Sequence, residues 1–150
     1  MKKGIILLLA AAFILGSCSN NALLNRKEDR LLGAWEFEDA SFKEDGDLFR
    51  DNVDDEFEGD VIEFFGDGTA LYDDFSLNAV FDGTWVLQLD RFDDNGESDA
   101  EFFLDMTFFD FVNRKEFSYF TNAITLTNNR MTLIANTRSG EYRFKLRKLN

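Results

Sequence analysis

The side chains that could do chemistry in this 150-residue chain are one cysteine, Cys18, and 29 carboxylates, because the sequence contains no histidine. Histidine-based triads, histidine general bases and histidine-ligated metal sites are therefore excluded, and a single thiol forms neither a disulfide framework nor a cysteine-rich zinc site. Among so many carboxylates, close pairs in the sequence are inevitable and do not indicate acid–base catalysis. We expect a protein that is not an enzyme and that carries no cofactor and no metal.

Two carboxylates, Asp73 and Asp105, are of interest because both fall inside predicted strands rather than turns. An inward-facing Asp73 or Asp105 would be a buried polar anchor for a ligand, with a pKa raised by burial. Alternation favours an outward Asp105, since its neighbours Leu104 and Met106 point inward. An inward carboxylate pair in an open pocket is what a carboxylate-based hydrolase or isomerase would need, and such an enzyme is the least favoured function.

The longest predicted loop, residues 41–59, is rich in acidic residues and holds two aromatic ones, Phe49 and Phe57. A long loop in a compact domain is often a lid or a binding loop, and the two rings could cover a pocket mouth. The other interpretation, which we favour slightly, is a solvated acidic loop. As a lid, its negative field would disfavour carboxylate ligands and favour neutral or cationic ones.

A second acidic run covers residues 90–99 and has the Asp, Asn and Gly content of a calcium loop. The EF-hand template fails, because Gly96 at its sixth position places Arg91 at the first and Phe102 at the last. We expect a turn with solvated charges there, and weak calcium binding at either acidic run stays open.

The N-terminus has the pattern of an export signal. Two lysines precede an apolar run over residues 5–15, which is too short to cross a bilayer, where about 20 residues are needed. A basic start with a short apolar segment is typical of a secretory signal. The run ends in Leu15-Gly16-Ser17-Cys18, which resembles the lipobox of bacterial lipoproteins.

The resemblance to lipoproteins implies that Cys18 becomes the mature N-terminus and carries lipid chains, rather than being an incidental cysteine in a plain signal peptide. More than one acyl chain gives stable membrane anchoring. The chain then divides into a signal peptide over residues 1–17, a lipidated tether over 18–30 and a folded domain over 31–150. Ser19 follows the cysteine, and in the lipoprotein family this favours the outer membrane of the cell envelope.

Composition limits the partners of the domain. A net charge of −13 makes nucleic acid an unsuitable partner, because phosphate binding needs clustered Lys and Arg. The chain is 45% hydrophobic with 18 phenylalanines, so it folds rather than remaining a disordered acidic tail. Its length fits one domain.

From Gly33 onward, apolar residues alternate with polar ones at a period of two, which predicts strands. Turn residues separate them, as in Gly66-Asp67-Gly68 and Asn128-Asn129. We predict an all-β fold with eight strands at 33–40, 60–65, 69–75, 80–89, 100–109, 116–127, 130–137 and 141–149. Short strands joined by hairpins favour an eight-stranded antiparallel up-and-down β-barrel, with a β-sandwich as the alternative. No segment has a helical stripe of useful length, apart from one turn near residues 27–32.

Four motifs then resemble, in order, those of lipocalins and of bacterial lipocalin-like lipoproteins. They are Gly33-Ala34-Trp35, the hairpin of residues 62–69 (IEFFGDGT), the strand of residues 81–87 (FDGTWVL), and the closing hairpins around residues 124–133 and 142–146. The resemblance covers residues 31–150. It implies an eight-stranded barrel with a pocket open at one end, and small apolar ligands.

The resemblance also implies a basic side chain stacked over Trp35 at the closed end. In an up-and-down barrel the first strand starts where the last one finishes, which brings Trp35 close to Arg147 and Lys148. Either of the two could pack on the indole. Gly33, Trp35, Arg147 and Lys148 are therefore expected to close the barrel rather than bind ligand.

We expect the domain to bind a small, mostly apolar ligand without covalent chemistry. The candidate ligand contacts are inward-facing residues of the predicted strands: Phe64, Leu87, Phe102, Leu104, Met106, Tyr119 and Tyr142. The same side chains could equally fill the barrel as core. In that case the alternative function is docking of an envelope protein, through the acidic loops or an apolar patch at Phe103 and Phe109.

Overall fold

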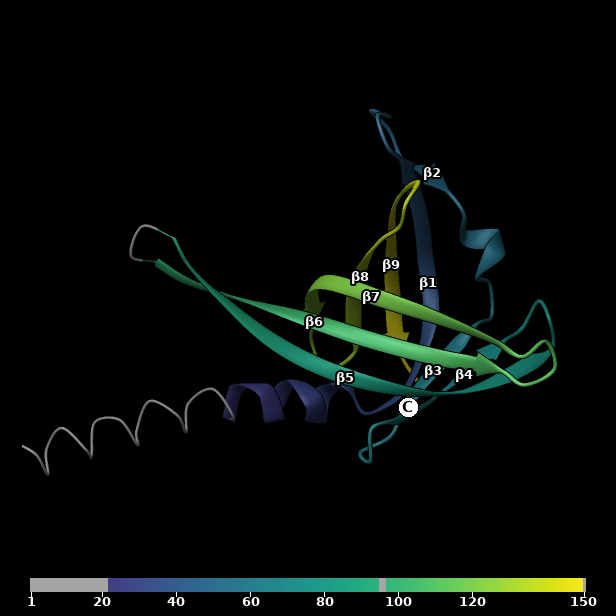
Figure 1. Ribbon diagram of the computed structural model, residues 1–150, viewed down its shortest axis with the longest axis horizontal. Helices are drawn as coiled ribbons and strands as arrows, with labels where there is room; N and C mark the ends of the chain where they lie inside the picture. The colour runs from purple at the N-terminus through teal and green to yellow at the C-terminus, as the bar shows by residue number, and fades with distance from the viewer. Residues whose placement is uncertain (1–21, 95–96, 150) are drawn as a thin grey trace, which may run out of the picture.

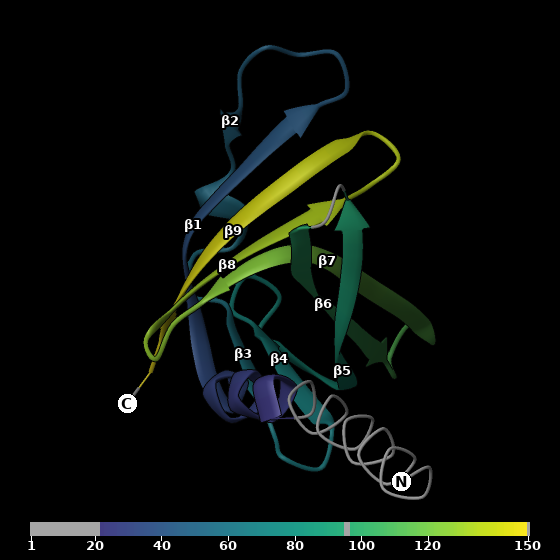
Figure 2. The ribbon, with the colours of Figure 1, turned by 90° about the vertical axis from the view of Figure 1, so that its left-hand side faces the viewer.

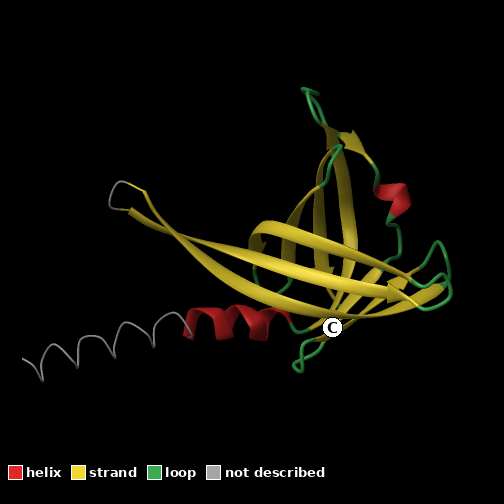
Figure 3. Cartoon of the chain, viewed as in Figure 1, coloured by secondary structure: helices red, strands yellow, loops and turns green. Residues whose placement is uncertain are grey.

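The computed structural model describes residues 22–94 and 97–149, so the signal peptide and Cys18 lie outside the described residues. The fold is all-β and antiparallel (Figures 1 and 3). Its strands are β1 (Gly33–Glu44), β2 (Asp51–Asn52), β3 (Val61–Phe64), β4 (Thr69–Asp74), β5 (Ala79–Asp94), β6 (Glu97–Asp110), β7 (Lys115–Leu126), β8 (Arg130–Asn136) and β9 (Gly140–Lys148), with a 3₁₀ turn, η1 (Asp54–Glu56). They pair in the order β2-β1-β3-β4-β5-β6-β7-β8-β9, and β1 also pairs with β9.

Each of the eight predicted strand segments is confirmed, and three of them are longer than expected. The strand β1 runs on to Glu44, so the first four residues of the predicted loop 41–59 belong to it. The acidic run 90–99 is not a long turn, because β5 and β6 continue through most of it and pair from Asp82↔Phe109 to Asp94↔Glu97. Alternation marks the half-buried part of a strand, whereas an exposed hairpin end can carry any polar residue.

The tether contains a helix, where one turn was predicted. Residues 22–31 are all helical, in a segment rich in good helix formers such as Ala, Leu, Arg, Lys and Glu. Leu24 and Leu31 lie seven residues apart on one face, and both contact the core. Figure 2 shows the helix lying at the end of the sheet where β1 begins. No helix within residues 22–94 and 97–149 is both long and apolar enough to cross a membrane.

Trp35 connects this helix to the last strand. Its side chain is fully buried, and its indole N–H donates a hydrogen bond of 2.7 Å to the carbonyl oxygen of Leu31. Its backbone pairs with Lys148, whose Nζ lies 5.2 Å from the indole centroid and donates to the carbonyl oxygen of Arg30. Burial lowers the pKa of Lys148. The residue over Trp35 is therefore Lys148, whereas Arg147 turns to the solvent side and pairs with Glu36 and Glu38.

Alternation sends every second side chain to the interior, as in β5, where Phe81, Trp85 and Leu87 are buried and Asp82, Thr84 and Val86 are exposed. Gly83 shares the inward parity of Phe81, and it pairs with Ala70 on one side and Phe108 on the other. A Cβ atom at Gly83 would overlap the Phe108 ring and the carbonyl oxygen of Thr107. The small size of Gly83 and Ala70 thus leaves the space that the fully buried Phe108 ring occupies.

We predict that Gly83→Ala lowers the free energy of unfolding by about 1–3 kcal/mol, as overpacking of a filled core does. Urea unfolding followed by tryptophan fluorescence measures the loss. Gly66→Ala is the matched control, because a Cβ there meets only a Leu32 methyl at 3.7 Å. Equal stability of the two variants would contradict the close packing between Gly83 and Phe108.

Candidate functional site

The interior of the sheet is filled by side chains. A narrow cavity lined by residues including Tyr72, Met106 and Phe144 measures about 10 Å³. A second of about 10 Å³ lies beside the helix, against Leu87 and Phe102. Each has room for about one water molecule. A ligand of ordinary size therefore finds no ready-made cavity between these side chains.

The predicted ligand contacts are distributed through this packed interior and do not form one site. Phe64, Leu87, Leu104 and Met106 are buried in the core, and the Phe64 ring meets Trp85 edge-on at 5.8 Å. Two others are half-buried at opposite ends. Phe102 lies under Lys27 Nζ at 5.0 Å, and Tyr142 stacks on Phe144 at 5.5 Å. The Tyr119 side chain lies outside the described residues.

The segment between β1 and β3 covers one side of the interior with a single ring. Phe57 packs on Phe37 at 5.4 Å and on Phe144 at 4.9 Å, whereas Phe49 is 83% exposed. Of the two rings expected over a pocket mouth, only Phe57 contacts the core. The Phe49 end of the segment is linked to β9 by an ion pair between Arg50 and Glu141.

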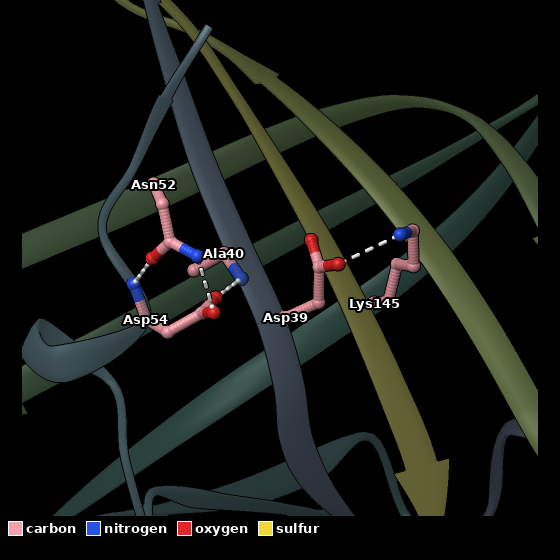
Figure 4. A network of polar contacts seen from close by, with 5 residues as sticks. All are labelled: Asp39, Ala40, Asn52, Asp54 and Lys145. Atoms are coloured by element: carbon pink, nitrogen blue, oxygen red, sulfur yellow. Dashed lines mark hydrogen bonds and ion pairs between the residues drawn. The ribbon is translucent and has the colours of Figure 1, made fainter.

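Asp54 fixes this segment against β1 (Figure 4). Its carboxylate accepts hydrogen bonds from the Ala40 backbone N–H and from Asn52 Nδ2, and the Ala40 bond is the main reason that the pKa of Asp54 is lowered. Nearby, Lys145 Nζ contacts Asp39 Oδ2 at 2.7 Å. Despite the many acids, no three acidic or cysteine side chains among the described residues lie close enough together to hold a metal ion.

A buried carboxylate that the sequence pattern did not single out is Asp60, which is 1% exposed. Tyr72 Oη donates a hydrogen bond to its Oδ2, and the Phe75 backbone N–H donates to its Oδ1 at 2.9 Å. Burial raises the pKa of Asp60, and the two hydrogen bonds oppose that rise. By contrast, Asp73 is exposed, and Asp105 lies between two inward residues and is half-buried. The acid that faces inward is therefore Asp60, directly before β3, rather than Asp73 or Asp105.

A third cavity, larger than the two of about 10 Å³, lies where the β4–β5 turn, the β6–β7 turn and η1 meet. Its volume is about 370 Å³. We call it the aromatic hollow. Its lining is aromatic at the base and charged at the rim, and consists of Glu56, Phe57, Tyr72, Asp74, Leu77, Phe81, Asp110, Lys115, Glu116 and Phe117. Figure 1 shows the two turns close together, at the end of the strands away from the helix.

The rings of the aromatic hollow hold one another in place. Phe81 and Phe117 meet edge-to-face with centroids 5.2 Å apart, and Tyr72 lies 6.1 Å from Phe81 and 6.2 Å from Phe117. Tyr72 is fixed in turn by its bond to Asp60. The base of the aromatic hollow is therefore a preformed aromatic corner, continuous with the core below.

Carboxylates also shape the two turns at the rim. Asp74 accepts hydrogen bonds of 2.8 Å from Ser76 Oγ and from the Leu77 N–H. Asp110 accepts from the N–H groups of Val112 and Asn113 at 2.9 Å, and the bond from Asn113 is the main cause of its lowered pKa. Both turns are thus closed by a carboxylate that bonds to backbone N–H groups two or three residues further along the chain.

Comparisons of the chain with protein-family models, with curated proteins and with solved structures found no match. The geometry of the described residues is therefore what supports a function.

We predict that Asp60→Asn changes how stability depends on pH. An acid with a raised folded-state pKa binds more protons folded than unfolded, so its contribution to stability falls as pH rises from about 4 through the raised pKa. Asp60→Asn removes that fall, at about 1.4 kcal/mol for each unit by which the pKa is raised. The free energy of unfolding of the variant minus that of the wild type, measured in urea from pH 3.5 to 8, should increase with pH.

The control for this titration is Asp82→Asn, which removes an exposed carboxylate that is not among the groups shifting the pKa of Asp60. The pH-dependent change should be larger for Asp60→Asn than for this control. Equal changes in the two variants would contradict the raised pKa of Asp60.

Proposed function

We propose that this protein is a lipid-anchored, lipocalin-like protein of the cell envelope that binds a small, mostly apolar ligand in the aromatic hollow. The proposal includes no covalent chemistry. The observation that carries it is the aromatic hollow itself, a cavity of about 370 Å³ with four aromatic rings in its lining. Small-molecule sites are concave, mostly apolar and usually preformed, with volumes of about 300–1,000 Å³.

For the fold, we propose the eight-stranded up-and-down barrel rather than a sandwich. Its support is that β1 pairs with β3 through residues 33–36 and with β9 through residues 35–44, so the paired strands lead from β1 back to β1. The short β2 pairs only at the far end of β1. In such a barrel the aromatic hollow is the open mouth, and the helix and Trp35 lie at the other end.

For the location, the support is in the sequence: the apolar run, the lipobox-like Leu15-Gly16-Ser17-Cys18 and Ser19. They favour a lipid anchor in the outer membrane. The helix at residues 22–31 begins a few residues after Cys18 and packs on the domain through Leu31. The folded domain would therefore stay close to the anchoring lipid.

A second candidate function is docking of another envelope protein. Its support is the set of large apolar side chains at the hairpin ends of the open mouth, each at least 65% exposed: Leu48, Phe49, Phe75, Leu77, Phe111 and Val112. Large apolar side chains exposed to water often mark interaction sites when they are contiguous; Leu48 and Phe49 lie on the β1–β2 turn, and the others on the β4–β5 and β6–β7 turns. A carboxylate-based enzyme has the least support, because Asp60 is the one buried acid among the side chains whose burial the structure describes, and its oxygens accept hydrogen bonds from Tyr72 Oη and the Phe75 N–H.

Native mass spectrometry of the full-length protein purified from its native envelope tests the ligand. We expect an added mass of a few hundred daltons, or about 20–30 non-hydrogen atoms, that remains after calcium chelation and is lost on denaturation. The denatured sample supplies the mass of the lipidated chain alone. A native mass equal to that of the chain alone, together with co-purification of one envelope protein in fixed ratio, would favour the docking function instead.

The anchor is tested by Cys18→Ser in the full-length chain. We expect the variant to lose the lipid mass and to move from the membrane pellet to the supernatant of ultracentrifuged envelope fractions, because no acyl chain is left to bury. Ser17→Ala, a small-residue change beside the cysteine, should leave the protein in the pellet. A Cys18→Ser variant that stays in the pellet after a carbonate wash would contradict the lipid anchor.

A further inference from the structure

We propose that the ligand of the aromatic hollow is an organic cation, in which an amine or quaternary ammonium group is joined to a small apolar or aromatic body. This inference rests on the proposed function, because it assumes that the aromatic hollow holds a ligand. It adds the chemical class of that ligand.

The base of the aromatic hollow has the geometry that attracts a cation. Phe81 and Phe117 stand at 88° to each other and Tyr72 is tilted by 69° from Phe117, so the rings face several directions around one corner. A cation within about 6 Å of a ring centroid is attracted by the negative face of the ring. The protein uses the same contact elsewhere, where Lys27 lies over Phe102 and Lys148 lies over Trp35.

The charged residues at the rim of the aromatic hollow favour a positively charged ligand. Four carboxylates line the aromatic hollow, from Glu56, Asp74, Asp110 and Glu116, against one ammonium group, from Lys115. Negative groups around a concave apolar base focus a negative field into it, which attracts cations and repels anions. Fatty acids and other carboxylate ligands therefore fit this site poorly, although its base is apolar.

The single lysine does not neutralise the rim. Lys115 is the direct cross-strand partner of Asp110 at the β6–β7 turn, and its charge contributes to the lowered pKa of Asp110. Within the described part of the chain, neither Glu56 nor Glu116 takes part in an ion pair. These two side chains come from η1 and β7 and supply negative charge at the rim that is not held in an ion pair.

Apolar contact is the remaining requirement, and Leu77 and Phe57 supply it at the sides. Leu77 is 67% exposed on the β4–β5 turn, and Phe57 is half-buried against Phe37. Covering Leu77 with a ligand would remove apolar surface from water. A ligand that places its ammonium group against the rings and the rim, and its apolar body against Leu77, would match both the negative charge and the apolar surface of the site.

The test is a calorimetric titration of the full-length protein, in the detergent used to extract it, with three probes that share a phenylethyl body and differ in their charged or polar group. These are the 2-phenylethylammonium ion, neutral 2-phenylethanol and the 3-phenylpropanoate anion. We expect the cation to bind about tenfold more tightly than the alcohol, as a cation–π contact with several rings allows, and the anion to bind least. Raising the salt concentration should weaken binding of the cation more than binding of the alcohol, because salt screens the rim charges.

The double substitution Glu56→Gln/Glu116→Gln should weaken binding of the cation about fivefold at low salt and leave the alcohol unchanged. The control is Asp29→Asn/Glu101→Gln, which removes the same charge from exposed positions on the helix and on β6, away from the aromatic hollow. An unchanged thermal unfolding midpoint shows that both variants fold.

The outcomes separate the two proposals. If the alcohol binds as tightly as the cation, the ligand class is wrong and the binding function stands. The same holds if the control variant weakens binding of the cation as much as Glu56→Gln/Glu116→Gln does. If none of the three probes binds, the aromatic hollow is not a small-molecule site, and both proposals are overturned.

Discussion

The burial of Trp35 joins the first strand to the helix just before it and to β3 and β9, which lie further along the sequence. Its side chain is fully buried, its N–H is bonded to the helix at Leu31, and its backbone pairs with Ile62 on one side and Lys148 on the other. Burying an indole contributes much apolar surface, but its N–H must find a partner or cost about 1–3 kcal/mol. The helix supplies that partner, so the first strand packs well only when the helix and the last strand are also in place.

A second constraint is the aromatic network, which extends from one side of the interior to the aromatic hollow. Phe57 contacts Phe37, Phe37 contacts Tyr72, and Tyr72 contacts Phe81 and Phe117. The cavity that Phe37, Phe57 and Tyr72 line with other core residues measures about 10 Å³, and Tyr72, Phe81 and Phe117 form the base of the aromatic hollow. The same packing that stabilises the domain therefore fixes the candidate site in advance, which lowers the cost of ordering it on binding.

The strands could be predicted from sequence because alternation reports burial directly, as the runs from Trp85 to Leu89 and from Tyr142 to Leu146 show. The helix at 22–31 could not, because a short polar segment depends on docking of Leu31 for its stability. Asp60 was missed because it is one of 29 carboxylates, and only the fold places Tyr72 over it. The aromatic hollow combines residues between 56 and 117 from four strands, η1 and the β4–β5 turn, so no spacing in the sequence reveals it.

The long hairpin of β5 and β6 has a consequence for how molecules of this protein meet. Beyond Thr84, β5 has no further ladder partner in β4, and before Leu104, β6 has none in β7. The ribbon of residues 86–94 and 97–103 therefore extends past the ladders with β4 and β7 as two strands that pair with each other, and a strand edge of this kind is where a strand of another molecule can add. The acidic residues in this ribbon, including Asp90 and Glu101, give both edges of every copy the same charge. Charged residues along a strand edge disfavour its pairing with another strand, so we expect the acidic run of residues 90–99 to disfavour edge-to-edge association.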